Sequence, residues 1–199
     1  MKQTFQSVFN RLSAIIPMHE PPAKPSWKLI PILCGSFLLT SVLLTRCKKD
    51  NTNGIDQKIQ SQLDTLDKQA SSELQQAWQA TSKYQDIKNA YADKYADIHV
   101  VMPNMGYHYM KSDILDSVFD AAKPELLVYN KKADSSFQLV AIEYAVPLDK
   151  SVNAPEGFPG NADVWEHNTS FGLWLLHAWV WSYNPAGIFH PTNPNVIVR

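Results

Sequence analysis

The stretch from Leu173 to Pro194 constrains the fold more than any other part of the sequence. It begins with an apolar run of nine residues, LWLLHAWVW, in which His177 is the one ionisable residue. Nine residues are too few to span a bilayer as a helix, and aromatic and branched side chains between Gly172 and Pro185 favour a strand. Because both faces of this strand are apolar, we expect a central strand that is covered on both sides.

A leader is indicated before the folded part of the chain. Residues 29–45 form an uncharged apolar run, with lysines before it and Arg46, Cys47 and further lysines after it. This order is typical of a signal peptide. The segment LLTRCKKD resembles the lipobox of bacterial lipoproteins, which implies lipidation of Cys47, although Arg46 stands where that family has a small residue. An uncleaved signal anchor is the alternative.

Both interpretations tether the remaining chain outside the cytoplasmic membrane, in the cell envelope. The expected organisation is therefore a signal or lipoprotein leader over residues 1–46, a polar linker over 47–54 and one domain over 55–199. A hydrophobic content of 45% allows one domain of ordinary size, and a net charge of −1 gives no reason to expect nucleic acid as a partner. Both cysteines, Cys34 and Cys47, precede that domain, which excludes a disulfide or a thiolate metal site within it.

The first part of the domain carries the spacing of amphipathic helices. Apolar residues recur at steps of three and four from Ile55 to Trp78, and again from Tyr84 to Ile98. We therefore predict two helices, with His99 at the end of the second.

The remaining chain predicts strands. Met105–Met110 is one, and Glu125–Asn130 with Phe137–Leu148 form a hairpin around a polar turn. On the last of these, alternation places Phe137, Leu139, Ala141, Glu143 and Ala145 on one face. Asp149–Ser170 is a long connection, which is often functional. The predicted fold is α+β, with two N-terminal helices packed on a curved, mainly antiparallel sheet of about four or five strands.

Three ionisable residues stand in the middle of predicted strands, namely His108, Glu143 and His177. A carboxylate among apolar neighbours is costly unless a donor, a cation or a metal meets it. Two imidazoles and one carboxylate are the ligands of His₂Glu zinc sites and of non-haem iron centres, so a divalent metal (Zn or Fe) is one interpretation. A metal-free polar pocket for a small ligand, with Tyr109 and Trp179 as further candidate ligand-binding residues, is a second. A structural hydrogen-bond network is a third.

Several motifs resemble those of an uncharacterised family of prokaryotic secreted proteins and lipoproteins. The motifs are VMPNMGYHY (101–109), KPELLVY (123–129), the EY pair at 143–144 and LHAWVWSYNPAGIF (176–189). The resemblance implies that His108, Glu143 and His177 belong to shared motifs, and it implies no activity. The resulting hypotheses are a tethered protein that binds a small ligand, a metal-dependent enzyme with Glu143 as ligand or general base, and a structural envelope protein.

Lipidation at Cys47 predicts that the protein incorporates labelled palmitate and that a Cys47→Ser variant does not. Labelling of growing cells, followed by isolation of the protein, measures this. Equal labelling of the variant would contradict lipidation, and an unlabelled but membrane-bound wild-type protein would select the signal anchor.

Overall fold

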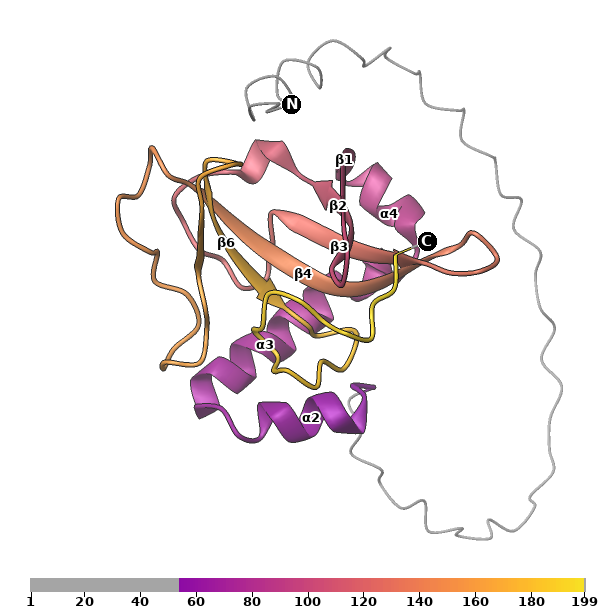
Figure 1. Cartoon of the computed structure of the whole chain (residues 1–199). Coiled ribbons are helices and arrows are strands. Elements are labelled where there is room, and N and C mark those ends of the chain that lie inside the picture. The colour runs from indigo at the N-terminus through magenta and orange to yellow at the C-terminus, as the bar shows by residue number, and fades with distance from the viewer. Residues whose placement is uncertain (1–53, 199) are drawn as a thin grey trace, which may run out of the picture.

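The structure, a computed structural model, describes residues 54–198. The leader and Cys47 therefore lie outside the described residues. Three α-helices precede a curled, six-stranded antiparallel sheet (Figure 1), and this arrangement belongs to the expected α+β class. The sheet has six strands rather than four or five. Within residues 54–198 there are three helices rather than two, and the first of these begins at Gln57, so they are not N-terminal in the chain. Within the described part, no helix has the length and apolar character needed to cross a bilayer.

The helices are α2 (Gln57–Leu63), α3 (Lys68–Thr81) and α4 (Ile87–Ala92), with 3-10 turns at Ser82–Gln85 and Ser112–Ile114. The strands are β1 (Ala96–Met102), β2 (Gly106–Met110), β3 (Leu126–Lys131), β4 (Phe137–Pro147), β5 (Glu166–Asn168) and β6 (Leu173–Ala178). They are hydrogen-bonded in the order β1-β2-β3-β4-β6-β5, and every neighbouring pair is antiparallel. The strands β1 and β5 are thus the two edges of the sheet.

An aspartate caps the N-terminus of each helix. The side chains of Asp56, Asp67 and Asp86 accept hydrogen bonds from the backbone N–H two residues later, at 2.8, 2.8 and 3.0 Å. Such caps satisfy N–H groups that have no partner inside the helix. The prediction of one helix from Ile55 to Trp78 is therefore wrong, because the chain turns after α2 and Asp67 starts a second helix.

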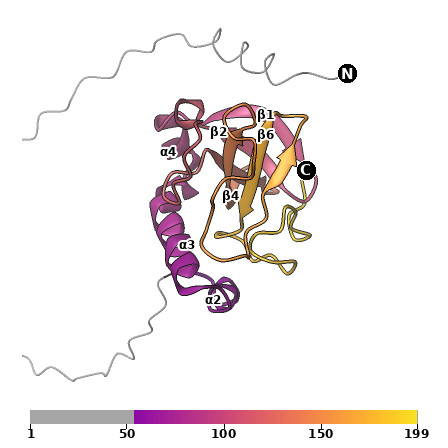
Figure 2. The ribbon, with the colours of Figure 1, turned by 90° about the vertical axis from the view of Figure 1, so that its left-hand side faces the viewer.

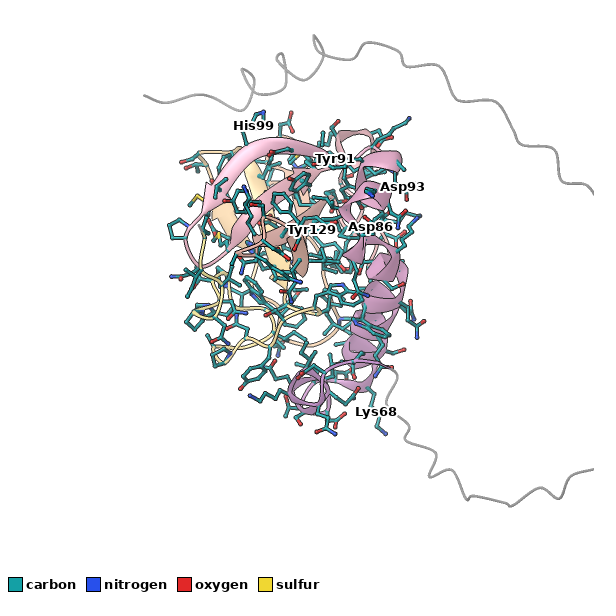
Figure 3. All side chains as sticks on the ribbon, turned by 90° about the vertical axis from the view of Figure 1, so that its right-hand side faces the viewer. Lys68, Asp86, Tyr91, Asp93, His99 and Tyr129 are labelled. Carbon is teal, nitrogen blue, oxygen red and sulfur yellow. The ribbon has the colours of Figure 1, made fainter. Side chains whose placement is uncertain are left out.

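The second predicted helix also ends earlier than its apolar spacing suggests. Lys94 takes a left-handed conformation with φ of 70°, and Tyr95 N–H donates to Ala90 O at 2.9 Å, which closes α4. The residues after it form β1. His99, expected at a helix end, lies in this edge strand, away from the helices (Figure 3). A bulge between Asp97 and Val100 gives His99 a φ of 58°.

The helices cover one face of the sheet. Figure 2 shows α3 and α4 along the same side of the strands, with α2 below them. Buried side chains between the layers include Leu74, Ala77, Tyr109, Tyr129, Ile142 and Leu176. Two buried hydroxyls connect distant segments, since Tyr129 donates to Tyr84 O and Tyr95 donates to Pro124 O, each at 2.7 Å. The opposite face of the sheet has no helix on it within residues 54–198 and carries two smaller apolar clusters.

The predicted hairpin is confirmed as β3 and β4, but its alternation of faces is interrupted. Val128 pairs with Ala141 and Tyr129 pairs with Leu139, so Val140 is an extra, bulged residue. Leu139 therefore joins the cluster under the helices, as Phe137 does. The prediction that these two share a face with Glu143 is wrong, because the bulge reverses the alternation.

The strand predicted over Leu173–Trp181 ends at Ala178. The backbone N–H of Trp179 donates to Ile188 O at 2.9 Å, which turns the chain out of the sheet. Trp181, in the part of the run that leaves the sheet, stacks on Trp78 with ring centroids 5.3 Å apart. The connection Asp149–Ser170 is also not free of regular structure, since it contains β5.

Gly106 at the start of β2 yields a prediction about stability. Its φ is 130°, and a Cβ there would lie 2.3 Å from the backbone oxygen of Tyr129. We expect Gly106→Ala to destabilise the fragment 54–199 by roughly 3 kcal/mol, because strain and a backbone clash act together. Urea unfolding followed by tryptophan fluorescence measures this.

Gly172 is the matched control. Its φ is 70°, but a Cβ there meets nothing within 4 Å. Gly172→Ala should therefore cost only the strain of the left-handed conformation, about 1 kcal/mol. Equal losses in the two variants would contradict the close contact between β2 and β3.

Candidate metal centre

The sheet brings His108, Glu143 and His177 together on the face opposite the helices. Glu143 on β4 is the direct partner of His177 on β6, so the two side chains project side by side. His108 lies on β2, where it pairs with Val128, and the curl of the sheet brings it back to Glu143. Glu143 Oε1 is 3.4 Å from His177 Nδ1, and Glu143 Oε2 is 3.7 Å from His108 Nε2. The expected convergence of three groups from three strands is present.

All three side chains are buried, with exposed fractions of 4% for His108, 2% for Glu143 and 4% for His177. His108 Nδ1 lies 3.1 Å from the carbonyl oxygen of Val100 on β1. A carbonyl only accepts, so Nδ1 donates its proton and the neutral ring directs the lone pair of Nε2 toward Glu143. A backbone carbonyl that orients an imidazole in this way is the usual second contact of a metal-binding histidine.

Burial makes the uncharged forms of these groups favourable. It raises the pKa of Glu143 from 4.5 to about 8, with a smaller contribution from the negative charge of Glu166. Burial, and then the nearby His108, lowers the pKa of His177 to about 3. Burial also lowers the pKa of His108. In the metal-free protein at neutral pH, two neutral imidazoles therefore surround a largely protonated acid.

The distances between Glu143 and the two imidazoles are closer to those between two ligands of one metal ion than to hydrogen-bond lengths. Hydrogen bonds of these groups are about 2.7–3.2 Å long, shorter than both distances to Glu143. Two ligands at about 2.0–2.1 Å from a tetrahedral ion are about 3.4 Å apart. One ligand atom from each residue lies within 4.8 Å of the other two, so the widest separation must close by up to roughly 1.4 Å around such an ion. His177 Nε2 has no hydrogen-bond partner among residues 54–198.

A cavity of about 90 Å³ adjoins the three residues. The strand β1 contributes Ile98 and Val100, and β6 contributes Leu173 and Leu175. The strand β5 contributes Glu166 and Asn168. Since β1 and β5 are the two edges of the sheet, both edges line the same cavity. The curled sheet therefore closes over a mainly apolar cavity with the His/Glu/His group in its wall.

Glu166 is a residue of this cavity that sequence reasoning missed. Asn168 Nδ2 donates to Glu166 Oε1 at 2.8 Å, and Asn168 Oδ1 accepts from the backbone N–H of Phe171 at 3.1 Å. These contacts hold a second carboxylate on the cavity side of β5. Glu166 has little signal in the sequence, since β5 has only three residues and lies inside a long connection.

The two further candidates, Tyr109 and Trp179, are not among the residues that line the cavity. Tyr109 is buried under the helices, where its ring meets Tyr129 edge to face at 5.2 Å. Trp179 stacks on the ring of His177 with centroids 6.0 Å apart, and its Nε1 donates to His190 O at 2.6 Å. Tyr109 thus lies away from the site, whereas Trp179 packs against the ring of His177.

Comparison of the chain with family models, with curated proteins and with solved structures finds no match. The resemblance to a family of secreted proteins stays a prediction.

The buried acid predicts a pH-dependent stability of the metal-free protein. Because the pKa of Glu143 is raised, its contribution to stability is fully present below pH 4.5 and is lost as the pH rises to about 8. His177 acts in the opposite sense, but only below its unfolded pKa of 6.5. Between pH 6.5 and 8 we expect the free energy of unfolding to fall, by up to about 1.4 kcal/mol per pH unit for one carboxyl.

Urea unfolding of wild type and Glu143→Gln at both ends of this range, with a chelator present, isolates the contribution of Glu143. The free energy of unfolding of the variant should fall less steeply with pH, because the contribution of Glu143 is absent. The variant should keep the pH dependence due to Glu125, another buried acid, whose pKa burial also raises to about 8. The same slope in both proteins would show that Glu143 does not titrate as expected.

Proposed function

We propose that the protein binds a transition-metal ion through His108, Glu143 and His177 and offers it to a small ligand in the adjoining cavity. The observation that carries this proposal is the geometry of the buried group, with Glu143 at 3.4 and 3.7 Å from two imidazole nitrogens. Metal binding would deprotonate Glu143 and give this carboxylate a buried partner of opposite charge.

The limited size of the cavity supports a small ligand. Typical pockets for organic ligands have volumes of about 300–1,000 Å³. A volume of about 90 Å³ has room for a ligand of a few non-hydrogen atoms. Three protein ligands leave at least one coordination position of a zinc or iron ion for such a molecule.

A second candidate function is a ligand pocket without a metal. The raised pKa of Glu143 favours it, because a protonated acid donates a hydrogen bond to a small acceptor molecule in the cavity. This candidate keeps the same residues and the same cavity. It differs in that Glu143 stays neutral when the ligand is bound.

We also propose that the domain is tethered to a membrane and faces the periplasm or the exterior. This part rests on the pattern of residues 29–47 alone, which lie outside the described residues. The tether would hold the cavity in the cell envelope, where small ligands and metal ions arrive from outside the cytoplasm.

The metal proposal predicts that wild-type protein, incubated with Zn²⁺ or Co²⁺ and then dialysed, keeps about one equivalent of metal. His177→Ala should lower the affinity by at least about 100-fold, because one of three ligands is lost. Elemental analysis and the visible absorption of Co²⁺ measure both results.

His167→Ala is the control, since His167 is exposed and meets Trp174 with ring centroids 4.6 Å apart. Its metal content should equal that of wild type. A wild-type protein that binds no metal would contradict the proposal. In that case a strongly destabilised Glu143→Leu would indicate a structural polar network, and a stabilised one would indicate the metal-free ligand pocket.

A further inference from the structure

All three methionines within residues 54–198 line the cavity beside the His/Glu/His group. They are Met102, Met105 and Met110, and the other two methionines of the chain precede residue 54. The proposed function uses none of them. A cavity wall needs apolar side chains, but it does not need thioethers, and leucine occurs in the same wall at 126, 173 and 175.

The three side chains lie at different depths. Met102 ends β1 and is 40% exposed, and Met105 is half-buried in the turn that follows. Met110 is buried, with 4% exposed. The register places Met110 beside Leu126 and Leu126 beside Glu143, so Met110 belongs to the same row across the sheet as Glu143 and His177. Thioethers thus extend from the surface to the level of the candidate ligands.

Thioether sulfur is a soft donor that selects copper(I) over zinc and other divalent ions. Imidazole also binds copper, so His108 and His177 are compatible with it. The apolar wall favours the lower charge, because the cost of burying an ion rises with the square of its charge. A singly charged copper ion is therefore easier to place in this cavity than a divalent ion.

Resting on the proposed metal site, we infer that the ion is copper(I), held by His108, Glu143 and His177 with the thioether of Met110 as a further ligand. Met102 and Met105 stand at the entrance and offer sulfur to an arriving ion. The Glu143 carboxylate, which lies between the two imidazoles, balances the single charge of the ion. The site is then one that acquires and holds copper(I) in the cell envelope.

The test compares two metals in two proteins. Full-length protein in detergent is titrated without oxygen with copper(I) against bicinchoninate, and separately with Zn²⁺ against a chelating dye. Met110→Leu keeps an apolar side chain of similar volume but removes the sulfur. We expect its affinity for copper(I) to fall at least about tenfold and its affinity for Zn²⁺ to stay within about twofold.

The outcomes separate this inference from the metal site itself. An unchanged copper(I) affinity in Met110→Leu, or an equal loss for both metals, would overturn the inference while zinc binding through the histidines stands. No metal binding by wild type would overturn both. X-ray absorption of the copper-loaded wild type gives a second readout without a variant: a sulfur neighbour supports the inference, and nitrogen and oxygen neighbours alone overturn it.

Discussion

The burial of one carboxyl group between two imidazoles is the constraint on which the site depends. The antiparallel register of β4 and β6 sets Glu143 opposite His177, and neither side chain reaches solvent. Charging such an acid in an apolar wall without a partner costs several kcal/mol, which is why its pKa rises to about 8. A leucine at this position would avoid that cost. Retaining the acid fits a site in which a cation or a ligand is its partner.

The curl of the sheet explains why this group lies beside a cavity rather than in a solid core. One face of the sheet is closed by the helices, whose apolar residues pack on Tyr109, Tyr129 and Leu176. The other face is closed by its own edges, since β1 and β5 both line the cavity. The side chains of these two edge strands leave a cavity between them, whereas the apolar side chains of the helices pack closely on the other face of the sheet. The cavity and its polar group thus follow from the same strand order.

Most of the correct predictions came from the alternation of side chains along strands and from the residues that form turns. The strand of His108, the hairpin of Glu143 and the first six residues of the strand of His177 are present, and the three groups converge. Features set by single residues were missed: the cap at Asp67, the left-handed Lys94 and the bulge at Val140 each interrupt a regular pattern. The strands β1 and β5 were missed because one continues a helical spacing and the other has three residues. Glu166 was missed with β5.

Anomalous diffraction from crystals of the zinc-soaked protein tests the central claim most directly, because it locates the ion and its ligands in one measurement. The predicted result is one strong peak within about 2.3 Å of His108 Nε2, a Glu143 oxygen and a ring nitrogen of His177. A peak that lies only at surface residues, with the three side chains hydrogen-bonded to one another and no metal between them, would contradict the claim.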